Sequence, residues 1–346
     1  MDKTPMDSPT IKDIARRAQV SPSTVSRVIN GKDIVKESTQ KKVMQVIEET
    51  NFFPNKFAQG LMNKKSNIIG VVVPWMRNPF YAELVSGIDS VLYRNGYSML
   101  LCDASSNTEK QVHHLKTLVE HQVEGIIIIN NSCRDKELLD VISRKACIIS
   151  VQTKIPGCDC VSSEEANGLF AATDHLLNLG HRRIAYICFL RSNEEERLVG
   201  FTRAFEHHGL PYCDELILSY KPHATTVEEL VVDAGRFLTN KLLEMDDPPT
   251  AILATSDFYA IGAYHAIKEK GLKIPEDISV CGFDDIEISR LLSPPMTTVK
   301  QFIYDKGKTC GELLIQRING DRDSIHREIV LPTSLVVRSS TAPPKR

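Results

Sequence analysis

The sequence predicts an α/β protein with an N-terminal three-helix head, containing a helix-turn-helix, before a core of two doubly wound parallel-sheet subdomains. The core is predicted because short apolar runs alternate with amphipathic helical segments from residue 68 onward, and because this alternation occurs twice. The head is predicted because residues 10–50 have the caps and apolar periodicity of three short helices.

The segment 10–30, TIKDIARRAQVSPSTVSRVIN, predicts two helices joined by a tight turn. Thr10 and Asp13 have the spacing of a capping box, which begins the first helix. Ser21 followed by Pro22 is an N-cap with proline at the first helical position, where no amide donor is lost. The second helix extends to about Asn30, and its outward face is narrow enough for the major groove of DNA.

A third helix is predicted from about Glu37 to Thr50, with Val43, Val46 and Ile47 on its inner face. Three helices in about 40 residues enclose only a small core. We therefore expect the order of this head to depend on DNA or on a partner subunit.

The eight runs predicted as core strands are rich in β-branched and other apolar residues. They are IIGVVVP, SMLLCDA, GIIIIN and CIISVQ in the first set, and RIAYICF, ELILSY, TAILATSD and ISVCGFDD in the second. We expect crossovers between the two sets near 160–163 and 291–298, and we expect EIVLPTSLVVR to return to the second set.

Composition and charge favour a soluble globular protein over a membrane or secreted protein. The chain of 346 residues is 42% hydrophobic and 25% charged, and it has no apolar run near the roughly 20 residues that cross a bilayer. Its first ten residues lack an apolar signal core, so we expect a cytoplasmic protein. Residues 1–65 carry 12 Lys or Arg against 7 Asp or Glu, whereas the remainder is acidic. A basic head suits contact with phosphate.

The pattern of the nine cysteines and the absence of catalytic motifs argue against disulfides, a metal site and enzyme activity. The cysteines occur singly apart from Cys158 and Cys160, an arrangement typical of reduced thiols in a cytoplasm. No second Cys or His cluster at zinc spacing accompanies that pair, so we expect no metal and no cofactor. The sequence also lacks a nucleophile elbow and a Gly-rich phosphate loop, so we expect no enzyme activity and no catalytic residues.

One segment of the predicted head resembles a known protein family. VSPSTVSRVING resembles the DNA-recognition segment of the LacI/GalR family of bacterial transcription regulators. Gln19 departs from the pattern, since the family usually has glycine there, and a positive φ at Gln19 would cost about 1 kcal/mol. The resemblance implies base and phosphate contacts in operator DNA from the following head residues: Thr10, Ser21, Pro22, Ser23, Thr24, Ser26, Arg27 and Asn30.

The next segment, FFPNKFAQGLMNKKS, resembles the hinge helix of the same family. The resemblance implies that Asn55 caps this helix, that Ala58 lets two copies pack closely across a dimer, and that Leu61 enters a minor-groove base step. Gly60 weakens a helix by about 1 kcal/mol relative to alanine, so we expect the hinge to be unfolded off DNA. The pattern alone is also compatible with an ordinary linker helix.

Ligand residues are expected at the carboxyl ends of the predicted strands, because open α/β sheets bind ligands there. Amides, carboxylates and aromatic rings at these ends suit a polyhydroxylated ligand. The strand ends bring together Asn78, Phe80, Tyr81, Asp103, Asn130, Asn131, Gln152, Tyr220, Asp257 and Asp284. For Asp103, Asn130, Asn131 and Gln152, solvated loop polarity or helix capping is the favoured interpretation.

The resemblance extends over nearly the whole chain, through VVVPWMRNPFYAELVSGID, LGHRRIAYI, RLVGF, ATSDFYAIGAYHAI and PPMTTVKQ. It implies a core similar to periplasmic sugar-binding proteins and a sugar-like effector. Arg197, in RLVGF, matches the family's effector-contacting arginine, and Asp257 and Asp284 match its effector-side acids. A structural ion pair between Arg197 and Asp284 across the cleft is the competing interpretation.

These observations predict a homodimeric repressor whose affinity for a near-palindromic operator depends on the effector. The end SSTAPPKR has no heptad pattern, so we expect a dimer rather than a tetramer. The alternative is a cytoplasmic sugar-binding protein or enzyme on the same core. The expected domains are a leader (1–9), a helix-turn-helix domain (10–53), a hinge (54–65), core subdomain 1 (66–161 and 293–320) and core subdomain 2 (162–292 and 321–340).

Overall fold

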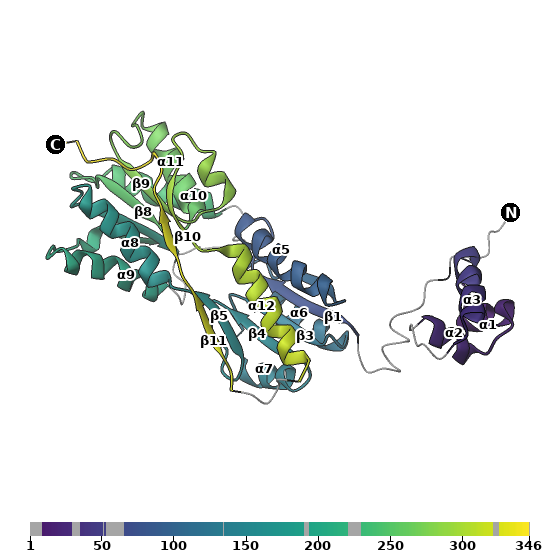
Figure 1. Ribbon diagram of the computed structural model, residues 1–346. Coiled ribbons are helices and arrows are strands. Elements are labelled where there is room, and N and C mark those ends of the chain that lie inside the picture. The colour runs from purple at the N-terminus through teal and green to yellow at the C-terminus, as the bar shows by residue number, and fades with distance from the viewer. Residues whose placement is uncertain are drawn as a thin grey trace. The chain divides into compact units, whose positions relative to one another are not determined.

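The computed structural model describes residues 9–29, 35–50, 52, 66–133, 135–189, 194–220, 230–320 and 325–345, and it divides into two units, Met1–Ser66 and Asn67–Arg346 (Figure 1). The described residues of the first unit form three helices. They are α1 (Ile11–Ala18), α2 (Pro22–Ile29) and α3 (Glu37–Thr50). Their core consists of small and β-branched side chains, namely Ile14, Ala15, Ala18, Val25, Val28 and Val43.

The capping box expected at the start of α1 is present. Thr10 accepts a hydrogen bond from the amide of Asp13 at 3.3 Å and donates its own amide to the Asp13 carboxylate at 3.0 Å, which completes a capping box. Gln19 ends α1 in the left-handed conformation, with φ 54° and ψ 45°. The turn therefore does require the positive φ that glycine adopts without strain.

The second unit contains two six-stranded sheets, which confirms the predicted fold class. Sheet 1 is parallel, in the order β11-β5-β4-β3-β1-β2. Its strands are β1 (Ile68–Val73), β2 (Ser98–Asp103), β3 (Gly125–Ile129), β4 (Cys147–Val151), β5 (Asp159–Ser163) and β11 (Glu328–Leu331). Its helices are α5 (Pro79–Arg94), α6 (Thr108–Glu120), α7 (Lys136–Ser143) and α12 (Ile303–Ile318).

Helices cover both faces of sheet 1. Helices α5 and α12 share one apolar cluster with the sheet, and α6 and α7 share another. Glycines let α5 and α12 approach closely, because a Cβ on Gly87 would lie 2.2 Å from the carbonyl oxygen of Tyr304, and one on Gly307 would lie 2.1 Å from that of Leu84.

Sheet 2 has the order β12-β10-β9-β8-β6-β7, and only β12 is antiparallel to its neighbour. Its strands are β6 (Ile184–Phe189), β7 (Ile217–Tyr220), β8 (Ala251–Ala254), β9 (Ser279–Asp284), β10 (Thr297–Lys300) and β12 (Ser334–Val336). Its α-helices are α8 (Glu165–Asn178), α9 (Glu194–His207), α10 (Leu230–Leu243) and α11 (Asp257–Glu269). Short 3-10 helices occupy η1 (Asp214–Leu216) and η2 (Glu287–Arg290). Helices α10 and α11 pack on one face of this sheet, and α8 and α9 pack on the other.

The chain crosses between the sheets at three places, after β5, after β10 and after β11. Two strands differ from the expected boundaries. Strand β10 belongs to sheet 2, although 293–320 was assigned to subdomain 1, and β11 belongs to sheet 1, although 321–340 was assigned to subdomain 2. The run EIVLPTSLVVR is two strands rather than one, because Pro332 lacks an amide donor and separates β11 from β12.

Candidate functional site

The outer face of α2 is polar and solvent-exposed. Pro22, Ser23 and Arg27 are exposed, Ser26 is half-buried, and Val25 packs into the head core. This division follows from the helical period, which places the apolar residues on one side. A helix with one guanidinium and two hydroxyls outward offers donors and acceptors to base edges.

The start of α2 is held by hydroxyl groups. Ser21 Oγ accepts the amide of Thr24 at 3.1 Å and lies 2.8 Å from Thr24 Oγ1 and 2.7 Å from Ser23 Oγ. Ser21 and Thr24 therefore have a capping role beside any contact with DNA. The remaining expected DNA contacts lie outside the described residues: Asn30, Asn55, Ala58 and Leu61.

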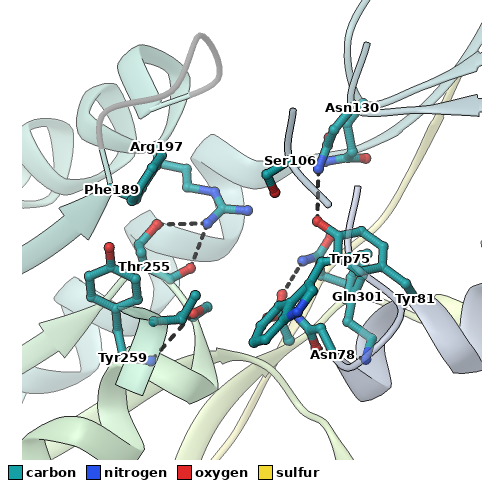
Figure 2. Close-up of a pocket in the computed structure, with 15 residues that line it drawn as sticks. Trp75, Asn78, Tyr81, Ser106, Asn130, Phe189, Arg197, Thr255, Tyr259 and Gln301 are labelled. Carbon is teal, nitrogen blue, oxygen red and sulfur yellow. Dashed lines mark hydrogen bonds between the residues drawn. The ribbon is translucent and has the colours of Figure 1, made fainter. Parts of the chain in front are cut away.

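A cleft lies at the carboxyl ends of the strands, between the two sheets of the second unit (Figure 2). It encloses about 800 Å³ when the space of its open mouth is counted. Its lining combines aromatic rings with amides, hydroxyls and two charged groups. The lining residues are Trp75, Asn78, Phe80, Tyr81, Ser106, Asn130, Gln152, Phe189, Arg197, Val231, Thr255, Ser256, Tyr259, Asp284 and Gln301.

The wall from sheet 1 is positioned by the start of α5. Asn78 caps this helix by accepting the amide of Phe80 at 3.0 Å, and the following turn brings Phe80 and Tyr81 to the cleft. The Tyr81 hydroxyl accepts a hydrogen bond from the amide nitrogen of Asn130 at 3.0 Å. Figure 2 shows Trp75, Tyr81 and Asn130 on the side opposite Arg197.

The wall from sheet 2 is organised around Arg197. Its Nε and Nη2 donate to the two carboxylate oxygens of Glu165 at 3.0 and 2.9 Å, and both side chains are buried. Its Nη1 donates to the Thr255 hydroxyl at 2.8 Å, and the guanidinium carbon lies 4.5 Å from the Phe283 ring centroid. The ion-pair partner of Arg197 is thus Glu165, whereas the competing interpretation had named Asp284.

Asp284 ends β9 at the base of the cleft and accepts a hydrogen bond from Gln301 Nε2 at 2.6 Å. Burial raises the pKa of Asp284 to about 7, although Arg197, Gln301 and Lys306 each lower it. Lys306, which is fully buried, donates to Gln301 Oε1 at 2.9 Å and to Gln152 Oε1 at 3.1 Å. Burial lowers the pKa of Lys306 to about 8, against the opposing effect of Glu165 and Asp284.

Three expected effector residues do not line the cleft. Asp103 accepts the amide of Ser105 at 2.8 Å and so forms a turn. Tyr220 packs edge-on against Phe237, with ring centroids 5.8 Å apart. Asp257 points into the core of subdomain 2, where it accepts the amide of Ile286 at 2.9 Å and the Thr298 hydroxyl at 2.5 Å. Burial, followed by the charge of Asp284, raises the pKa of Asp257.

Asn130 and Gln152 line the cleft, although loop polarity or helix capping was the favoured interpretation for both. Both turn the chain at a strand end with positive φ, 50° and 67°. Asn131 instead bonds to the Cys133 carbonyl at 3.1 Å. Sequence reasoning missed eight lining residues, which lie at a strand end, in loops after strands or at helix starts: Trp75, Ser106, Phe189, Val231, Thr255, Ser256, Tyr259 and Gln301.

Two negative findings apply to the part of the chain that the structure describes. No group of three or more His, Cys, Asp or Glu side chains there is arranged to hold a metal ion. No helix there combines the length and the apolar character needed to span a bilayer.

Comparisons with known proteins match both units. Residues 10–55 match the family profile for bacterial regulatory proteins of the lacI family, and residues 173–341 match that of a periplasmic binding protein-like domain. The ribose operon repressor of Haemophilus influenzae is 33% identical over 334 residues, which are 96% of this chain and 98% of that one. The HTH-type transcriptional repressor PurR of Aliivibrio fischeri is 35% identical over 341 residues, which are 96% and 98%.

Solved structures show the same architecture. The lac repressor dimer bound to operator and the anti-inducer ONPF is similar with a TM-score of 0.83 at 28% identity, covering 97% of this chain and 100% of that one. A LacI family regulator from Enterococcus faecium with bound ribose is similar with a TM-score of 0.71 at 29% identity, covering 80% and 100%.

Proposed function

Because the chain belongs to the lacI family of bacterial regulatory proteins, we propose that it is a homodimeric repressor whose operator affinity is set by a sugar-like effector in the cleft. The observation that carries this proposal is the cleft itself, in which amides, hydroxyls, a carboxylate and aromatic rings line the space between two subdomains. The comparisons support both halves, since one relative binds operator as a dimer and another holds ribose.

The polar residues of the cleft suit the hydroxyl groups of a sugar. Asn78, Asn130 and Gln152 offer amides, Asp284 offers an acceptor, and the Phe80 ring offers an apolar face. Of the effector residues expected from the sequence, we retain Asn78, Phe80, Tyr81, Arg197 and Asp284. The chain acts by binding this ligand rather than by transforming it, and it acts in the cytoplasm, where its operator is.

The exposed face of α2 supplies the DNA contacts of the proposal. Pro22, Ser23, Ser26 and Arg27 face outward together, so they can meet base edges in one major groove. A single small head contacts too few base pairs for selectivity in a genome, so two heads on a near-palindromic site are required.

The test uses two strand-end carboxylates of the intact protein. An operator that the protein binds is first selected from genomic fragments. Binding of the protein to this operator is then measured by fluorescence anisotropy while each of a panel of sugars is titrated. Asp284→Asn should weaken the effector response about tenfold or more, because a carboxyl oxygen that accepts a hydrogen bond from a ligand hydroxyl is replaced by an amide nitrogen that cannot accept one. Asp103→Asn, outside the cleft, should leave the response unchanged. Equal effects of both variants, or no selected operator, would contradict the proposal.

A further inference from the structure

Glu165 lies beneath the cleft wall without lining it. It is the first residue of α8, directly after the first crossover between the sheets, and only 2% of its surface is exposed. Its carboxylate accepts two hydrogen bonds from Arg197 in the bidentate geometry, and a further one from Gln152 Nε2. A buried carboxylate is costly unless it is paired, so this pair is a built feature of the site.

The pair fixes both the position and the charge balance of Arg197. Thr255 holds the Nη1 edge of the guanidinium through its hydroxyl and its carbonyl oxygen, at 2.8 and 2.5 Å, while Glu165 holds the opposite edge. Phe283 lies against the guanidinium plane. The guanidinium of Arg197 is therefore held rigidly at the cleft wall, and its positive charge is already matched by an adjacent carboxylate.

The other charged groups at the base of the cleft are balanced as well. Among the described lining residues only Arg197 and Asp284 carry charge. Lys306 is buried nearby and is connected to Asp284 by hydrogen bonds through the side chain of Gln301. With Glu165, the base contains two carboxylates and two cations. An anionic ligand would bring an uncompensated negative charge into a site whose own charges already balance, whereas a neutral ligand adds none.

We propose that Glu165 is a specificity-determining residue, which neutralises Arg197 and thereby selects an uncharged effector over sugar acids and sugar phosphates. The inference rests on the proposed function of the cleft and defines the chemical class of its ligand. It assigns to Glu165, which does not contact the ligand, the exclusion of anions by an arginine site that would otherwise attract them.

The first experiment measures inorganic phosphate binding to the full chain, wild type and Glu165→Gln, by thermal shift at constant ionic strength. The variant leaves the charge of Arg197 uncompensated, so phosphate should bind it about tenfold or more tightly than it binds the wild type. Glu164→Gln is the matched control, because it removes the adjacent, exposed carboxylate and should behave as the wild type. The double variant Glu165→Gln with Arg197→Met should lose the gain.

An unchanged phosphate affinity in Glu165→Gln, or an equal gain in Glu164→Gln, would overturn the proposal. This measurement needs no knowledge of the effector or operator, so its failure is distinct from failure of the proposed function. If Glu165→Gln does not fold, the thermal shift of the wild type decides between neutral and anionic ligands. D-glucose is then compared with D-glucuronate, and D-ribose with D-ribose 5-phosphate. Stabilisation by a neutral member supports the inference, and stabilisation by the anionic member alone contradicts it.

Discussion

Gln301 donates a hydrogen bond from Nε2 to Oδ1 of Asp284 at 2.6 Å, and its own Oε1 accepts one from Lys306 at 2.9 Å. Gln301 follows β10, at the second crossover between the sheets, so the pair ties the crossover to the end of β9. The same lysine reaches Gln152, whose amide contacts Glu165. One chain of hydrogen bonds thus connects the base of the cleft across both subdomains.

Asp284→Asn should change the pH dependence of stability. The folded protein holds the Asp284 proton up to pH about 7, whereas the unfolded chain releases it near 3.8. The stabilisation from protonated Asp284 is therefore lost as the pH rises from about 4 to 7, by up to about 1.4 kcal/mol per pH unit. In urea unfolding, the variant should gain stability relative to wild type across that window, and a constant difference would contradict the raised pKa.

Lys306→Met should alter a different pH range. Burial lowers the pKa of Lys306 to about 8, while the unfolded chain holds this proton up to about 10.5. Because the unfolded state binds more protons in that window, the wild type should become more stable relative to the variant as the pH rises from 8 to 10.5. Lys308→Met, on the same helix but more exposed, is the control and should give a curve parallel to wild type.

Gln19→Gly should stabilise the head. Gln19 has φ 54°, where glycine is unstrained, and it accepts only a long 3.4 Å hydrogen bond from Lys42 on its exposed side chain. The gain should reach about 1 kcal/mol, or roughly fivefold slower hydrogen exchange of α1 and α2 amides. Gln45→Gly, in the interior of α3, is the opposite control and should destabilise by a similar amount. Faster exchange in Gln19→Gly would contradict the strain argument.

Arg27→Ala should reduce operator selectivity more than general DNA affinity. Arg27 is exposed in the last turn of α2, where a planar guanidinium can bond guanine bidentately. We expect a loss of roughly 1–3 kcal/mol on the operator and a much smaller loss on random DNA. Arg17→Ala, on α1, removes the same charge and should weaken both alike. An equal loss on both DNAs in Arg27→Ala would make Arg27 a phosphate contact.

Sequence periodicity was sufficient for the eight strands and three head helices, because each has a one-sided or continuous apolar pattern that is local in the chain. The sheets to which β10 and β11 belong were not predictable, because the pattern within a strand does not show which strand pairs with it. The partner of β11 is β5, which lies far away in the sequence. A single proline, Pro332, separates β11 from β12 and so places the two strands in different sheets. The pairing of Arg197 with Glu165, 32 positions earlier, is likewise a tertiary result.

The predicted carboxyl ends of the strands gave the position of the cleft, but they did not show which side chains face it. Asp257 follows β8 and Asp284 ends β9, both in sheet 2. Asp257 begins a helix and turns inward, where it accepts a hydrogen bond from Thr298, whereas Asp284 adopts φ 127° and reaches the cleft. Backbone conformation at the strand end decides this direction, and a carboxylate in the sequence carries no sign of it.

Trp75 should report ligand binding, because it is the only tryptophan of the chain and lines the cleft. Its ring centroid lies 5.9 Å from that of Phe258 in α11, so this contact joins the loop after β1 to the opposite subdomain. The buried indole nitrogen has no hydrogen-bond partner among the described residues, which leaves its N–H as a donor for a ligand. A ligand that enters should therefore change the tryptophan emission in a saturable manner. Phe258→Ala should expose the indole and shift its emission to the red before any ligand is added. Phe237→Ala, which removes a ring that packs on Tyr220, should leave the emission as in wild type. Identical spectra for Phe258→Ala and wild type would show that the two rings do not meet in solution, and Trp75 would then not report the relative position of the subdomains.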